Sequence, residues 1–169
     1  MNATVKLYNY NFASIKTYLF ATIFVVGNII LPQVAHFVPQ GGFIFLPIYF
    51  FTLIAAYKYG LKVGLLTAIL SPVINHLLFG MPPMAVLPAI LIKSVLLAGT
   101  AAYLARRSNA VTLVNLVLAV LVYQFAGTML EWALVRDFTV AIQDFRIGVP
   151  GMLLQIFGGF ALLKAIEKR

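Results

Sequence analysis

Long apolar runs separated by short polar connections dominate the chain. Two of them, 61–79 and 85–104, flank the turn Gly80-Met81-Pro82-Pro83. Each is long enough as an α-helix to cross about 30 Å of hydrocarbon. Similar runs cover 18–38, 110–135 and 149–166, and a shorter one covers 43–57. The pattern therefore predicts an all-α membrane protein with six transmembrane helices, folded as a single domain over residues 1–169.

Composition agrees with a membrane location. Of the 169 residues, 63% are hydrophobic and only 9% are charged, whereas a soluble domain carries roughly 25% charged residues. The absence of cysteine excludes disulfides and thiolate chemistry. The net charge of +8 comes from basic residues at the ends of apolar runs, not from a basic stripe. We therefore expect a lipid bilayer as the environment and no nucleic-acid partner.

The basic residues also predict the orientation, because cytoplasmic connections are enriched in Lys and Arg. One side of the predicted bundle collects nine of them, and the other side collects only Arg136 and Arg146. We therefore expect both termini in the cytoplasm. The nine are Lys6, Lys16, Lys58, Lys62, Arg106, Arg107, Lys164, Lys168 and Arg169.

Polar side chains inside the predicted spans fall in the outer half of the membrane. Because burying an amide or a charge in hydrocarbon is costly, such groups are expected to face protein or water. Gln124, Thr128 and Glu131 share one helical face. The sequence thus predicts a polar chamber that opens outward. The candidate substrate-binding residues are Asn75, His76, Lys93, Gln124, Glu131, Trp132 and Gln155, and Asp144 and Arg146 are candidates for a gate.

Each candidate also has a purely structural interpretation. Lys93 and Glu131 could form an ion pair that holds the bundle together, and Gln124 could join helices by hydrogen bonds. Asp144 and Arg146 could pair in a solvated loop. Gln155 could join helices as Gln124 does, Asn75 and His76 could be packing residues, and Trp132 could be an interface anchor.

Small residues and soft ligands add two weaker patterns. Ala13, Thr17 and Ala21 are spaced so that another helix could approach closely, either a partner's or one of the chain's own. His36, His76, Met81 and Met84 have no spacing typical of a metal site.

No motif of an enzyme is present. The chain has no G-x-S-x-G, no H-E-x-x-H and no P-loop. It cannot hydrolyse ATP by itself, so a transporter of this kind would depend on a partner, on an ion gradient or on a slow solitary mode.

The Gly80-Met81-Pro82-Pro83 turn followed by PAILIKSVLLAG resembles the substrate-binding S components of energy-coupling factor (ECF) vitamin transporters, and Ile147-Gly148-Val149-Pro150-Gly151 is similar to the start of their last helix. The resemblance implies a subunit of a prokaryotic cytoplasmic membrane that binds a small vitamin. It also implies a transmembrane T component and two ATPase subunits as partners. ATP would be used by those partners, with no cofactor held permanently here. Ala13, Thr17 and Ala21 are the nearest match to the family's docking run.

Three other functions stay open at this point. The chain could be a solitary S-component-like transporter, or a membrane scaffold that transports nothing. It could also be an intramembrane enzyme in which His76 and Glu131 act as acid and base, which needs the two within hydrogen-bond reach.

Overall fold

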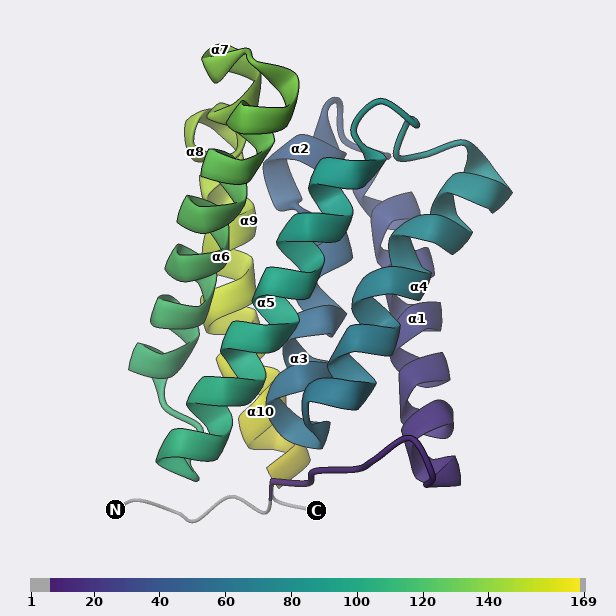
Figure 1. Cartoon of the computed structure of the whole chain (residues 1–169), viewed down its shortest axis with the longest axis vertical. Helices are drawn as coiled ribbons and strands as arrows, with labels where there is room; N and C mark the ends of the chain where they lie inside the picture. Colours follow the sequence, from purple (N-terminus) through teal and green to yellow (C-terminus); the bar gives the residue numbers. More distant parts are fainter. Residues whose placement is uncertain (1–6, 168–169) are drawn as a thin grey trace.

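The computed structural model describes residues 7–167, and within them every regular element is helical. Figure 1 shows the helices aligned along one axis as a bundle. Five segments are long and apolar enough to cross a membrane: α1 (Ile15–Ala35), α4 (Leu61–Phe79), α5 (Leu87–Ser108), α6 (Leu113–Val135) and the composite C-terminal helix Val149–Ile166. The chain is therefore a multi-pass α-helical membrane protein.

The predicted second span is not one continuous helix. The run divides into α2 (Gly41–Phe45), a 3-10 turn at Pro47–Tyr49 and α3 (Phe50–Tyr59). Leu46 has φ 46° and ψ 47°, a left-handed conformation that a helix cannot continue through. Pro47 follows it and supplies no backbone N–H. The predicted second span is therefore a broken segment, beside five segments that are each long and apolar enough to cross a membrane.

Helix α3 forms the centre of the bundle. Leu53, Ile54, Ala55 and Ala56 are fully buried, and α3 packs against α1, α4 and α5. Outward-facing side chains of the long helices are instead large and apolar, including Ile23 and Ile30 of α1 and Phe125 of α6. This distribution matches a helix bundle whose surface contacts lipid.

The C-terminal span is made of α9 (Val149–Leu153), a π-helical turn at Leu154–Gly158 and α10 (Gly159–Glu167). Before it, α7 (Phe138–Ala141) and α8 (Gln143–Ile147) lie across one end of the bundle together with α2 (Figure 1). Asp137 caps α7 by accepting hydrogen bonds from the Thr139 side chain and from the backbone N–H of Val140, which lower the pKa of its carboxyl.

The first turn of α1 and the last turn of α10 lie at the same end of the bundle (Figure 1). We call this the basic end, because six of the nine predicted cytoplasmic basic residues lie at helix ends there: Lys16, Lys58, Lys62, Arg106, Arg107 and Lys164. Lys6, Lys168 and Arg169 lie outside the described residues. We call the opposite end, formed by α2, α7 and α8, the cavity end, because the structure has a cavity there.

The small-residue run at the start of α1 is not an exposed face. Ala13 is exposed but precedes the helix, whereas Thr17 and Ala21 are 0% and 2% exposed. The Thr17 hydroxyl donates a hydrogen bond to the backbone oxygen of Asn11. Two of the three positions therefore pack within the chain, which is the intramolecular alternative for this spacing.

Asn28 ties three helices together inside the apolar core. Its Nδ2 donates to the hydroxyls of Thr52 and Ser71 at 3.1 and 3.2 Å, and its Oδ1 accepts from the backbone N–H of Phe51. That N–H belongs to the first turn of α3 and has no partner within its own helix. The amide therefore substitutes for a helix cap at a buried position.

We expect Asn28→Leu to lower the stability of the bundle by about 1–3 kcal/mol, because it leaves the Phe51 N–H buried without an acceptor. Thermal unfolding in mild detergent measures the effect. Val26→Leu, on the exposed side of the same helix, serves as the control and should unfold at the wild-type temperature. Equal unfolding temperatures for both variants would show that Asn28 does not support α3.

Candidate ligand-binding site

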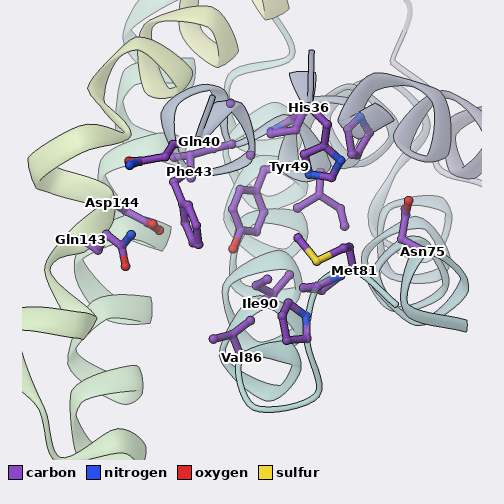
Figure 2. A pocket seen from close by; sticks show the side chains of 18 of the residues that line it. His36, Gln40, Phe43, Tyr49, Asn75, Met81, Val86, Ile90, Gln143 and Asp144 are labelled. Atoms are coloured by element: carbon purple, nitrogen blue, oxygen red, sulfur yellow. The ribbon is translucent and has the colours of Figure 1, made fainter. Parts of the chain in front are cut away.

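A cavity of about 470 Å³ lies at the cavity end of the bundle. Small-molecule sites in proteins typically measure roughly 300–1,000 Å³. The cavity is enclosed by the end of α1, the broken segment, the turn between α4 and α5, and α8 (Figure 2). Exposed side chains such as His36, Gln40 and Met81 line it. It therefore reaches the surface of the protein at this end.

Most of the cavity wall is apolar, which differs from the polar chamber that the sequence predicts. Ring and branched side chains make up much of the lining: Val38, Phe43, Leu46, Ile48, Tyr49, Val86, Ile90 and Val140, with Pro32, Pro39, Pro47, Pro82 and Pro83 between them. The reason is that only part of the predicted polar set reaches this space. The cavity suits a ligand with an apolar body and a small number of polar groups.

The charged part of the wall is a cluster of three side chains from three helices. Lys93 of α5 lies 2.6 Å from Glu131 of α6 and 2.8 Å from Asp144 of α8, measured from Nζ to the nearest carboxylate oxygen. All three line the cavity, and their side chains are 4%, 10% and 13% exposed. The cluster joins three elements at the cavity wall and carries a net charge of −1.

Asp144 does not pair with Arg146, contrary to the loop pair expected as an alternative from sequence. Its carboxylate turns to Lys93, whereas Arg146 is exposed and does not line the cavity. Asp144 lies in the first turn of α8, where its carboxylate meets Lys93. Gly127 of α6 leaves room for the methylene chain of Lys93. A Cβ at Gly127 would meet the Cγ of Lys93.

Asn75 contributes a buried amide from α4, on the side of the cavity away from Asp144 (Figure 2). Its Nδ2 donates to the backbone oxygens of Asn28 and Ser71, both at 2.9 Å. Its Oδ1 is buried and has no hydrogen-bond partner among the described residues. An amide oxygen of a cavity-lining residue can accept a hydrogen bond from a ligand that donates one.

Gln124 and Gln155 do not line the cavity. Both are fully buried, and both bond to Tyr123 of α6: the Tyr123 hydroxyl donates to Gln155 Oε1 at 2.8 Å and accepts from Gln124 Nε2 at 3.1 Å. The hydrogen bond from Tyr123 to Gln155 joins α6 to the π-helical turn. For Gln155 this is the interhelical hydrogen bond that was its structural alternative, whereas Gln124 bonds to a neighbour in its own helix.

His76 and Trp132 also lie outside the cavity wall. His76 Nδ1 is 2.8 Å from the backbone oxygen of Pro82 and so fastens the turn after α4. Trp132 is 43% exposed and packs edge-to-face on Phe138, with ring centroids 5.4 Å apart. Within residues 7–167, neither of them contacts the charged cluster through a hydrogen bond or ion pair.

The broken segment supplies lining residues that the sequence did not single out. Phe43 and Tyr49 place aromatic rings in the cavity, and Gln40 lies at its edge (Figure 2). A signal for them was present, since Gly41-Gly42 precede the apolar run 43–57 and Pro47 interrupts it. Irregular backbone at membrane depth is tolerated where it is buried in protein or lines a cavity.

Among the described residues, the two side chains of the acid–base alternative both have other partners. Glu131 is engaged by Lys93, and His76 is engaged by the Pro82 carbonyl. Among the described residues no group of three or more His, Asp or Glu side chains could hold a metal ion. The cavity has the size of a small-molecule binding site.

Compared with known protein families, with curated proteins and with solved structures, the chain matches none. The fold and the cavity therefore define the class by themselves. The chain is an α-helical, multi-pass membrane protein with a cavity of ligand size at one end.

Proposed function

We propose that the chain is a membrane substrate-binding subunit for uptake of a small water-soluble vitamin or cofactor precursor. The cavity at the end opposite the basic end carries this proposal. If the basic end is cytoplasmic, as Lys and Arg enrichment favours, the cavity faces the exterior of a prokaryotic cytoplasmic membrane. A solute captured there would have the whole bundle between it and the cytoplasm.

In the proposed mechanism the cavity captures the solute and the bundle then reorients. The resemblance to S components assigns the energy for this step to a transmembrane T component and two ATPase subunits. A solitary mode of transport is the second candidate. The burial of Thr17 and Ala21 favours it, because the matching docking run is occupied by the chain's own packing.

The decisive experiment is gentle purification from the native host. Mass spectrometry of the released small molecules identifies the ligand, and protein analysis of the same sample shows which subunits accompany it. A stoichiometric vitamin or precursor supports the proposal, and accompanying ATPase subunits support the ECF form of it. A preparation free of any small solute, from cells supplied with vitamins, would contradict it.

Filling the cavity should stop uptake. Ala89 is 6% exposed and lines the cavity, so Ala89→Phe is expected to reduce uptake of the identified solute at least tenfold because the added ring occupies ligand space. Ala133→Phe adds the same ring at an exposed position of α6 outside the cavity. Uptake by cells expressing each variant at equal level is the measurement. Similar uptake by the two variants would show that the cavity is not the transport site.

A further inference from the structure

We propose that the cavity selects a small organic cation, that is, an ammonium- or amidinium-bearing molecule with an apolar, ring-sized body. The inference rests on the proposed function, because it names the ligand class of the same site. It goes beyond that function by fixing the sign of the ligand's charge. Three features of the wall support it.

The first feature is the balance of charge. Within residues 7–167 the ionised side chains at the cavity wall are Lys93, Glu131 and Asp144, which sum to −1. Lys93 is already within 2.8 Å of both carboxylates. An anionic ligand would therefore have to displace a carboxylate from Lys93 and would leave the wall with a second excess negative charge. A cation instead neutralises the excess that is present.

The second feature is the surplus of hydrogen-bond acceptors. Glu131 Oε1 and Asp144 Oδ1 accept no hydrogen bond from another described residue. Asn75 Oδ1, on a residue that is 1% exposed, also has no partner there. A carbonyl or carboxylate oxygen can only accept, so the ligand must bring N–H or O–H donors. An ammonium or amidinium group brings several donors together with the required charge.

The third feature is the remainder of the wall. Phe43 and Tyr49 present aromatic rings, and Val86 and Ile90 present aliphatic surface (Figure 2). Aromatic faces attract organic cations and also cover apolar rings. A bare metal cation would not use this surface, and the described residues offer no group of three metal-binding side chains. The wall therefore matches a cation with a carbon skeleton.

A matched set of probes isolates the sign of the charge. Phenethylamine, 2-phenylethanol and phenylacetate share one skeleton and differ only in carrying a positive, a neutral or a negative group at neutral pH. Equilibrium dialysis against the full chain purified in mild detergent gives the three affinities. We expect phenethylamine to bind at least tenfold more tightly than phenylacetate, with 2-phenylethanol between them.

Two substitutions connect that preference to the cavity. Asp144→Asn brings the wall to zero net charge while an amide oxygen remains to accept from Lys93, so the preference for phenethylamine over phenylacetate should fall about tenfold. Asp137→Asn makes the same charge change at an exposed residue outside the cavity. It retains a side chain suited to helix capping and should leave the preference unchanged.

Phenylacetate binding as tightly as phenethylamine, or no measurable binding of phenethylamine at millimolar concentration, would overturn the inference. So would an equal loss of preference in the Asp144 and Asp137 variants. Failure of the proposed function is separate. If a neutral or anionic solute is co-purified and imported, the inferred positive charge of the ligand is wrong and the proposed transport function is supported. If phenethylamine binds but the protein imports nothing, the inferred charge is supported and the transport function is wrong.

Discussion

Lys93→Met should destabilise the protein by about 3–5 kcal/mol, which corresponds to roughly 10 °C in unfolding temperature. The substitution keeps most of the side-chain volume and removes the charge. Glu131 and Asp144 would then be two mostly buried carboxylates without a cation between them. Thermal unfolding in detergent at neutral pH measures the loss.

A combined variant shows whether charge is the cause. Adding Glu131→Gln and Asp144→Asn to Lys93→Met removes all three charges, and we expect it to recover most of the lost stability because no unpaired charge remains. Lys16→Met, at an exposed position of α1, is the control for loss of one positive charge. A combined variant as unstable as Lys93→Met alone would show that packing of the lysine stem, and not pairing, is what matters.

Gly64→Ala should push α4 away from α3 and lower the free energy of unfolding by about 1–3 kcal/mol. A Cβ at Gly64 of α4 would lie 2.7 Å from the Cα of Ala56 in α3. Because the obstacle is backbone, no side-chain rotation can relieve the contact. The helices would have to move apart and loosen the packing around a fully buried α3.

Gly99→Ala is the matched control for this change. Gly99 is also inside a long helix, and a Cβ there would meet nothing within 4 Å. The unfolding temperature of the Gly99→Ala variant in detergent should equal or slightly exceed that of wild type, since alanine favours helix more than glycine does. Equal losses in the two variants would show that the close approach of α3 and α4 at Gly64 does not determine the result.

The long spans follow from the sequence because their cause is local. A run of apolar residues long enough to cross hydrocarbon must satisfy its backbone internally, and a helix is the available way to do so. The predicted 61–79 and 149–166 coincide with α4 and the C-terminal span, and 110–135 begins three residues before α6. The break in the predicted second span did not follow from the sequence, because a hydropathy pattern does not register the left-handed residue at Leu46.

Which polar side chains reach the cavity could be predicted from the sequence only in part. Gln124 and Glu131 do share one buried face of α6, as their spacing predicts. Seven residues correspond to about 10 Å along the axis, however, so Glu131 reaches the cavity while Gln124 bonds to Tyr123 further down the helix. The sequence also supplied no reason to join Asp144 to Lys93, since the two are 51 positions apart.

The chain's hydropathy and charge by themselves determined a multi-pass helical membrane protein with most of its described basic residues at one end, because both properties act locally along each helix. Only the tertiary structure decided which polar groups share a cavity. That depends on how each helix is rotated and which neighbour it meets, and on the broken segment that places Phe43 and Tyr49 beside the cluster of Lys93, Glu131 and Asp144.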